Sequence, residues 1–288
     1  MSGLLTEVWD KARAGRIEKD EYARLSEALE AVRDRNDIAW MQAWIVLHCA
    51  TRNKAFATQR LIARLSRVSR KAGQEAEYYA FLRLVEDDLG FYLPNGSAFT
   101  ESFRGADVDA VMADCRVLAA RMAELGLEVF ANSGTLLGLV REGKLLDYDN
   151  DIDLGVLLAA RNEADAAQEW IALCDRLITE GVGVERSTWS GVTLKLNKIG
   201  PFGVDLFPAW IDETERVFVY PHTFGTLTSA QVLPFSHHAG TGLGMPSDAE
   251  AMLASNYGDS WRVPNEGWTF GWKEANARFA GFLDAVKV

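Results

Sequence analysis

The spacing of apolar residues changes once along this chain of 288 residues, near residue 95, and that change limits the folds open to it. Before it, apolar side chains recur every three or four residues, as in 22–32 and 38–47, which predicts amphipathic helices. After it, short apolar runs alternate with helical stretches. We therefore expect an all-helical front region followed by an α+β region, a mixed sheet flanked by helices.

A turn-rich segment separates the two regions. Residues 93–97 read Leu-Pro-Asn-Gly-Ser, and the proline and glycine interrupt the helical pattern there. The sequence therefore predicts a helical N-terminal domain over residues 1–95 and a second domain over residues 96–288. Two domains also suit the length, because single hydrophobic cores rarely grow far beyond about 250 residues.

The composition is that of a folded, acidic protein. It is 48% hydrophobic and 25% charged, with a net charge of −11, which excludes disordered, collagen-like and coiled-coil proteins. The acidic balance argues against a general nucleic-acid-binding surface, since affinity for phosphates depends chiefly on clustered lysine and arginine. Residues 1–95 contain 15 basic and 14 acidic residues, so the acidic excess belongs to the second region.

One stretch of the first region is strongly basic. Seven lysines and arginines occur between residues 52 and 71, with no acidic residue among them. Those that share one face of the predicted amphipathic helix are Arg60, Arg64, Arg67 and Lys71. The simpler interpretation is a face exposed to solvent, and pairing of its cations with acids of the second region is a variant of that interpretation. Peripheral contact with a membrane surface is the alternative interpretation.

The cysteines and the N-terminus favour a cytoplasmic location. Cys49, Cys115 and Cys174 are widely separated within apolar, helix-like stretches, so we expect buried, reduced thiols rather than disulfides or a zinc site. The chain does not start with a basic segment followed by an apolar core. No uncharged stretch approaches the roughly 20 apolar residues that cross a bilayer, so a transmembrane segment is not expected.

Three aspartates at alternate positions are the first candidate site. A continuous strand through Asp149, Asp151 and Asp153 would place the three carboxylates on one face. Such carboxylates repel one another, and a fold tolerates them readily when a cation neutralises them. Oxygen ligands of this kind suit Mg²⁺ or Mn²⁺, which bridge carboxylates to substrate phosphates. An acidic strand end without a metal is the alternative interpretation of this motif alone.

Two further motifs support a metal and phosphate site. Ser133-Gly134-Thr135 fall where a strand is expected to end and a helix to begin. A glycine there lets the backbone approach a ligand, and the free N–H groups of a helix N-terminus attract phosphate. Asp205 stands between apolar neighbours on a later short strand, as expected of a ligand from an adjacent strand. The candidate metal ligands are Asp149, Asp151, Asp153 and Asp205.

These motifs resemble one family. The run SGTLLGLVR at 133–141, the run DNDIDL at 149–154, the strand GVDLFP at 203–208 and the segment 245–264 follow the order found in LicD/fukutin-type phosphotransferases, members of the nucleotidyltransferase superfamily. In the family the acidic motif reads W-D-D-D-I-D. Here tyrosine replaces the tryptophan and asparagine replaces the middle aspartate, and Leu-Asp precedes them where Ile-Pro is common. Residues 1–95 have no counterpart in the family pattern.

The resemblance implies a nucleotidyltransferase-type sheet and a Mg²⁺-dependent reaction. A substituted phosphate, such as phosphocholine or a polyol phosphate, would pass from a CDP-linked donor to a hydroxyl of a glycan or lipid-linked glycan. Asp151 and Asp153 would hold the metal against the diphosphate, and Asp205 would complete a second metal site or deprotonate the acceptor. Arg141 and Lys195 would neutralise phosphate charge, or they are ordinary surface cations.

Two other functions use the same residues differently. A nucleotidyltransferase would move the nucleotidyl group itself from a triphosphate to a small molecule or protein, because the same core supports attack at another phosphorus. A binding or scaffold protein without activity is the third hypothesis. The repelling aspartates argue against the third, because a protein without metal chemistry gains nothing from them. The head group, the acceptor and the oligomeric state have no readable pattern in the sequence.

Overall fold

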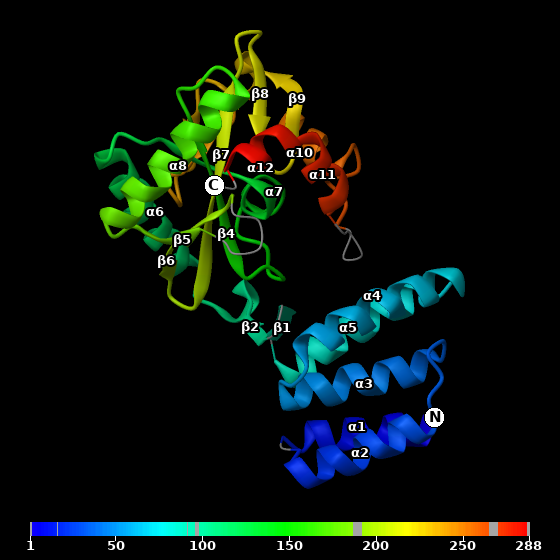
Figure 1. Ribbon diagram of the computed structural model, residues 1–288. Coiled ribbons are helices and arrows are strands. Elements are labelled where there is room, and N and C mark those ends of the chain that lie inside the picture. Colours follow the sequence, from blue (N-terminus) through cyan, green and yellow to red (C-terminus); the bar gives the residue numbers. More distant parts are fainter. Residues whose placement is uncertain are drawn as a thin grey trace. The chain divides into compact units, whose positions relative to one another are not determined.

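The structure is a computed structural model that describes residues 2–15, 17–90, 92–95, 98–186, 192–264 and 270–286. The chain divides into two compact units, the first running to Gly105 and the second starting at Ala106. We call them the helical unit and the sheet unit, and each is described by itself (Figure 1).

The helical unit confirms the expected helical front region. Its five helices are α1 (Ser2–Arg13), α2 (Lys19–Ala31), α3 (Ile38–Thr51), α4 (Ala55–Lys71) and α5 (Glu75–Leu89). A hairpin of β1 (Tyr92–Asn95) and β2 (Ala98–Glu101) follows, and a 3₁₀ turn over Phe103–Gly105 ends the unit. The segment expected as a simple turn therefore forms two short strands. The predicted boundary after residue 95 falls between them, and the division of the chain into 1–95 and 96–288 stays a prediction.

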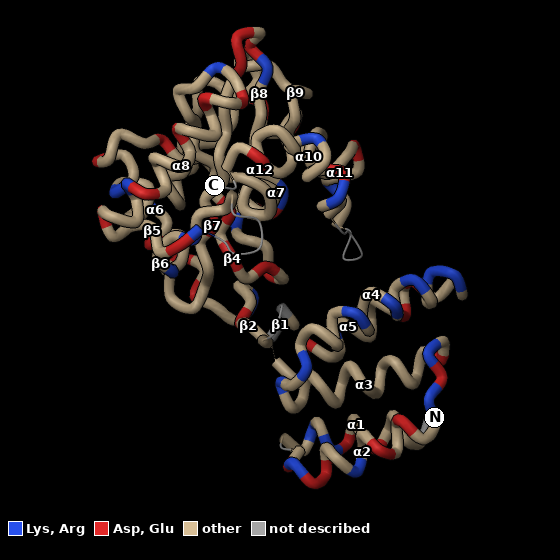
Figure 2. The backbone as a smooth tube through the Cα atoms, viewed as in Figure 1, with Lys and Arg blue, Asp and Glu red and all other residues tan. Residues whose placement is uncertain are grey.

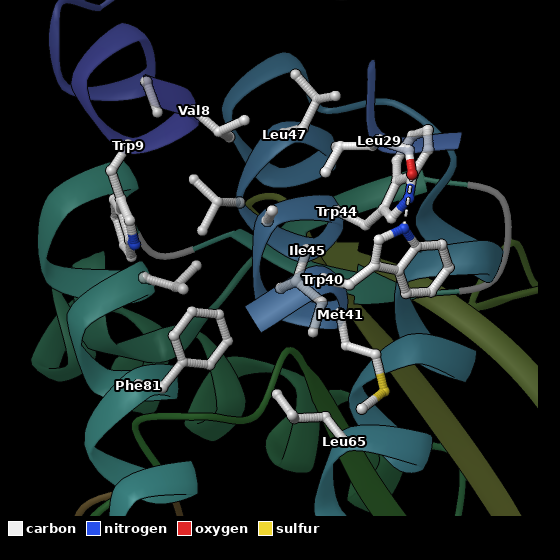
Figure 3. Packing of buried hydrophobic residues seen from close by; sticks show 14 of the residues in the cluster. Val8, Trp9, Leu29, Trp40, Met41, Trp44, Ile45, Leu47, Leu65 and Phe81 are labelled. Atoms are coloured by element: carbon white, nitrogen blue, oxygen red, sulfur yellow. Dashed lines mark hydrogen bonds between the residues drawn. The ribbon is translucent and has the colours of Figure 1, made fainter. Parts of the chain in front are cut away.

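Helix α3 is the centre of the helical unit. It is apolar around most of its circumference and packs against the other four helices, as a helix without a polar face must. Trp40 on α3 donates its indole N–H to the carbonyl oxygen of Leu29 over 2.8 Å, which satisfies a buried donor (Figure 3). Further along α3, the buried His48 places Nδ1 3.0 Å from the hydroxyl oxygen of Thr58. Burial lowers the pKa of His48 to about 4, so the ring is neutral at pH 7.

The sheet unit alternates helices and strands. Its first elements are α6 (Val108–Glu124), β3 (Val129–Ala131), α7 (Ser133–Arg141), β4 (Asp151–Leu157), α8 (Glu163–Thr179), β5 (Gly183–Arg186), β6 (Leu194–Ile199) and β7 (Phe202–Ile211). The later elements are β8 (Arg216–Val219), β9 (Thr223–Thr228), α9 (Ser229–Val232), β10 (Ser236–His237), β11 (Gly244–Met245), α10 (Ala249–Tyr257), α11 (Trp272–Arg278) and α12 (Ala280–Val286).

The strands form one mixed sheet. Within the described residues the order is β10-β11-β3-β4-β7-β6-β5, and β8 and β9 extend from β7 as an antiparallel pair. Strands β4 and β7 run parallel, whereas β3 is antiparallel to β4 and β6 is antiparallel to β7. Helix α8 packs against β5, β7 and α12, and α7 packs against β4 and α10 (Figure 1). The predicted α+β class, a mixed sheet with helices around it, is confirmed.

Strand β4 is anchored by one face and presents the other to the candidate site. Ile152, Leu154 and Val156 are fully buried and alternate with the partly buried Asp151 and Asp153, the two-residue period of a strand.

Among the described helices of both units, none is both long enough and apolar enough to cross a membrane.

Candidate functional site

Strand register brings the charged residues into one row across the sheet. Asp153 on β4 pairs directly with Asp205 on β7, and Asp205 pairs with Lys195 on β6. Residues directly opposite one another on neighbouring strands share a face of the sheet. Three strands therefore contribute one side chain each to the same row. Asp151 lies opposite Gly203, and so adds a carboxylate two residues away from the row.

Three carboxylates converge at this row. Oxygens of Asp151, Asp153 and Asp205 lie within 4.8 Å of one another. Burial raises the pKa of Asp153 well above its usual value, and the neighbouring negative charges raise it further. The pKa of Asp205 is raised by burial, although its contact with Lys195 acts in the opposite direction. Without a cation, holding these groups ionised costs free energy.

Asp149 lies beside this cluster but is not part of it. Strand β4 begins at Asp151, and Asp149 belongs to the turn before it, so the expectation of one continuous strand through all three aspartates is wrong at this residue. Asp149 still interacts with the side chain of Asp151, and burial raises the pKa of both carboxyl groups. Its role as a metal ligand stays a prediction.

The Ser133-Gly134-Thr135 loop is bound to Asp153 in both directions. The N–H of Gly134 donates to Oδ2 of Asp153 over 3.3 Å, and the N–H of Asp153 donates to the Thr135 hydroxyl over 2.8 Å. Ser133 has φ of 44°, in the left-handed region, a strained conformation for a residue with a side chain. A β-carbon at Gly134 would meet Oδ2 of Asp149 at 2.4 Å. These first residues of α7 therefore hold Asp153, and a side chain at residue 134 would have to displace the Asp149 carboxylate.

Lys195 contacts Asp205. Its Nζ lies 2.6 and 2.7 Å from the two carboxylate oxygens of Asp205, and the side chain of Lys195 remains 43% exposed. The pairing follows directly from the register of β6 and β7. The phosphate-binding role expected of Lys195 stays a prediction, and in the structure its charge is used to hold a carboxylate.

Arg141 ends helix α7, away from the Gly134 loop at the start of that helix. Its guanidinium donates to Glu142 over 2.8 Å and to the carbonyl of Trp261 over 3.4 Å. The buried Nε has no hydrogen-bond partner within the described chain. The structure therefore does not bring Arg141 into the carboxylate row.

Tyr257 is a residue whose place the sequence did not reveal. It lies at the end of α10, where Asp153, Asp149 and Arg141 all act on it electrostatically. Burial and the two negative charges raise the pKa of its hydroxyl above the usual value, so it is a neutral phenol at pH 7. Tyr257 belongs to the segment 245–264, the last of the four motifs that resemble the family, but that motif assigns no role to the tyrosine.

Asn132 is a second unexpected member of the site. Its backbone N–H donates to the carbonyl of Asp153 over 3.0 Å and continues the β3–β4 ladder by one residue. Its side chain is fully buried, and neither amide atom has a hydrogen-bond partner among the residues described. A buried unpaired amide is costly and typical of functional sites. An asparagine before a helix normally predicts only a cap.

The donor set fits a divalent cation. All three clustered side chains offer carboxylate oxygens, the ligands that Mg²⁺ and Mn²⁺ prefer. Their burial and mutual repulsion raise the pKa of each, and a bound cation would reverse both effects. The cluster therefore has the composition and electrostatics of a metal site.

A sheet with two aspartates on β4, a third on the parallel β7 and a glycine turn before α7 defines a domain of the nucleotidyltransferase class. Residues 126–241 match the family described as LicD/FKTN/FKRP, nucleotidyltransferase domain. The match covers less than half of the chain and lies within the sheet unit, and it confirms the resemblance seen in the motifs. The match contains the whole carboxylate row, whereas Tyr257 and the helical unit lie outside it. No curated protein sequence matches the chain significantly.

Proposed function

We propose that the protein transfers a substituted phosphate from a CDP-linked donor to a hydroxyl of a glycan or lipid-linked glycan, with Mg²⁺ or Mn²⁺ as cofactor. Membership of a phosphotransferase-type family supports a transferase. The observation that carries the proposal is the convergence of Asp151, Asp153 and Asp205 within 4.8 Å beside the α7 loop. Phosphoryl transfer depends mainly on positioning and charge neutralisation, which such a row supplies.

In this proposal each side chain of the row has a distinct task. Asp151 and Asp153 would hold the cation, and the loop bonded to Asp153 would keep that carboxylate in place. A bound cation supplies positive charge to the diphosphate oxygens and to the departing nucleotide. Asp205 would take the proton from the acceptor hydroxyl or, alternatively, contribute to a second metal site.

The bond changes follow from these positions. As Asp205 takes the proton, the acceptor oxygen forms a bond to the phosphorus that carries the head group. The bond from that phosphorus to the bridging oxygen breaks, and cytidine monophosphate leaves with the electron pair. Lys195 would keep Asp205 oriented during this step through its two short contacts. No serine or cysteine nucleophile is required, because the acceptor oxygen is the attacking group.

The products of the reaction test this proposal. The purified protein is incubated with Mg²⁺, a lipid-linked or free glycan and either CDP-choline or a CDP-polyol, and released nucleotides are separated by chromatography. Release of cytidine monophosphate that depends on both metal and acceptor is the expected result. Release of pyrophosphate from a nucleoside triphosphate, with none of the monophosphate from CDP donors, would contradict the proposal and establish nucleotidyl transfer instead.

Binding measurements separate an enzyme from an inactive scaffold. Calorimetry with Mg²⁺ and CDP-choline should show metal-dependent binding to the sheet unit of the intact chain. Absence of binding of either metal or nucleotide would contradict the enzymatic proposal.

A further inference from the structure

Helix α4 presents a row of cations on the side facing away from the core of the helical unit. Leu65, Thr58 and Ser69 are buried on the inner side of the helix. The outer side carries a set that we call the α4 basic face, consisting of Phe56, Arg60, Arg64, Arg67, Arg70 and Lys71. At 3.6 residues per turn these six positions fall within about a third of the circumference, opposite the buried residues. Figure 2 shows lysine and arginine recurring along α4.

Most cations of this face form no ion pair within the described part of the helical unit. Within the described part of the helical unit, no carboxylate lies within ion-pair distance of Arg60, Arg64, Arg67 or Lys71, whereas Arg70 meets Glu75 at 3.3 Å. Like charges three and four residues apart on a helix repel one another. The face therefore carries a local electrostatic cost that an anionic surface would remove.

The rest of the helical unit is organised differently. Arg13 pairs with Asp88 at 2.7 Å, Arg104 pairs with Asp87 at 2.8 Å, and Arg24 is held by Glu7 and Glu21. Ion pairs between surface charges are thus the ordinary arrangement of this unit, and α4 departs from it. The pairing of the basic stretch with acids of the second region stays a prediction.

An aromatic side chain stands among the cations. Phe56 is 61% exposed, and the guanidinium of Arg60 lies 5.9 Å from the centre of its ring. A cationic row with an exposed aromatic ring matches the boundary between lipid headgroups and acyl chains, where cations meet phosphates and the ring enters the apolar layer. The row is straight and about 25 Å long, which suits a planar surface.

We propose that the α4 basic face docks the protein on the anionic phospholipid headgroups of a membrane surface. The apolar side of α4 stays in the helical core, so the helix lies on the bilayer and contacts it through its cations and Phe56. The proposal does not rest on the proposed reaction, because it concerns a unit outside the family match. It would place a catalytic sheet unit near acceptors carried by lipids.

Vesicle binding by the full-length protein tests the proposal. The protein is sedimented with vesicles of phosphatidylcholine containing about a third phosphatidylglycerol, with pure phosphatidylcholine vesicles as the neutral control. We expect partition into the anionic vesicles only, and its loss at roughly 0.5 M salt. Absence of binding to the anionic vesicles would overturn the proposal.

Matched variants locate the surface. The test variant combines Arg60→Gln, Arg64→Gln and Arg67→Gln, and the control combines Lys11→Gln, Lys19→Gln and Arg33→Gln, which remove equal charge from the same unit. Partition should fall about a hundredfold in the test variant and less than threefold in the control. Circular dichroism checks that both variants remain folded. Equal losses in both would overturn the assignment to α4.

Two further measurements distinguish a membrane from another polyanion. Phe56→Ser should lower partition about fivefold, because the ring no longer enters the lipid; unchanged partition would overturn the proposal. Tighter binding to a DNA duplex than to the anionic vesicles would also overturn it, since the surface would then be a nucleic-acid site.

Discussion

The two units of this chain bury polar groups in opposite ways. The helical unit buries a neutral pair, His48 beside Thr58, and leaves its cations outside. The sheet unit draws three carboxylates together at the end of a row and holds one of them with a lysine. A neutral buried pair serves stability, whereas converging like charges oppose it. The difference indicates that the sheet unit gives up stability in its interior for a site, whereas the polar pair buried in the helical unit is neutral.

The largest expected effect tests whether the converging charges are the active centre. Asp153→Asn should lower the rate of nucleotide release by about a thousandfold or more, because it removes the charge of one of the three clustered carboxylates. Steady-state release of cytidine monophosphate measures it. The matched control is Asp147→Asn, which removes an equal charge from a residue paired with Lys144 at 2.5 Å. A rate for Asp153→Asn close to that of the control would contradict the comparison.

The second expected effect concerns the response of the helical unit to pH. The folded pKa of His48 is about 4 against an ordinary 6.5, so the unfolded state binds the proton first. The contribution of His48 to stability is complete above pH 6.5 and is lost as the pH falls towards 4. The loss amounts to about 3 kcal/mol.

Hydrogen exchange of peptides from α3 measures this response, with protection factors corrected for intrinsic exchange at each pH. His48→Gln serves as the control, because it should remove the pH dependence even if it lowers stability throughout. In the metal-free protein, peptides from β4 should respond with the opposite sign. Asp151 and Asp153 on β4 have raised folded pKa values, so protonation relieves repulsion and protection rises as the pH falls from neutrality. The same sign in both units would contradict the comparison.

A third and smaller effect tests how closely the α7 loop fits the carboxylates. Gly134→Ala should reduce kcat/KM about tenfold, because its β-carbon would displace Asp149, whose Oδ2 would lie 2.4 Å away. Gly203→Ala is the matched control, since a β-carbon there meets Asp151 at an ordinary 3.7 Å and should change kcat/KM less than twofold. Equal effects of the two substitutions would show that the loop is not fitted to the cluster.

The smallest expected effect belongs to the helical core. Trp40→Phe removes the indole donor to the Leu29 carbonyl and should lower the free energy of unfolding by about 1 kcal/mol. Nucleotide release by the folded variant should stay at the wild-type rate, because the substitution touches no residue of the carboxylate row. Chemical denaturation followed by circular dichroism measures the free energy of unfolding. A rate of nucleotide release that falls by more than the fraction of folded protein would contradict the view that the helical core takes no part in the reaction.

The sequence reveals those parts of the fold that depend on local patterns. The helical period predicts α2, α3 and α4 within an all-helical front region, and the motifs place α7, β4 and β7 to within a few residues. Strands β8 and β9 and the short β10 and β11 are not predicted by the sequence, because they are brief and the tendency of so short a run to form a strand depends on its pairing partner. The hairpin of β1 and β2 is equally brief, and the sequence predicts only a turn at 93–97.

The candidate site also combines features that local sequence patterns predict with features that depend on strand pairing. The aspartates of β4 and β7 are visible as residue types, but their meeting depends on a parallel register that no local pattern encodes. The contact of Lys195 with Asp205 also follows from register, and for that reason Lys195 looked like a phosphate ligand. The sequence does not predict Asn132 or Tyr257 as site residues, because a single asparagine or tyrosine forms no characteristic spacing with other residues.

Parallel pairing of β4 with β7 also has a consequence for how the site comes into existence. The two aspartates at its centre are separated by a crossover that contains α8, β5 and β6, and closing so long a connection is slow relative to forming the local hairpins. Strand β4 carries two of the three clustered carboxylates and β7 carries the third, so the complete cluster forms only when the two strands pair. Metal affinity measured during refolding would therefore report the pairing of β4 with β7, the last long-range step of the sheet unit. Magnesium added early should stabilise the paired strands once they have formed, but it should not accelerate their pairing.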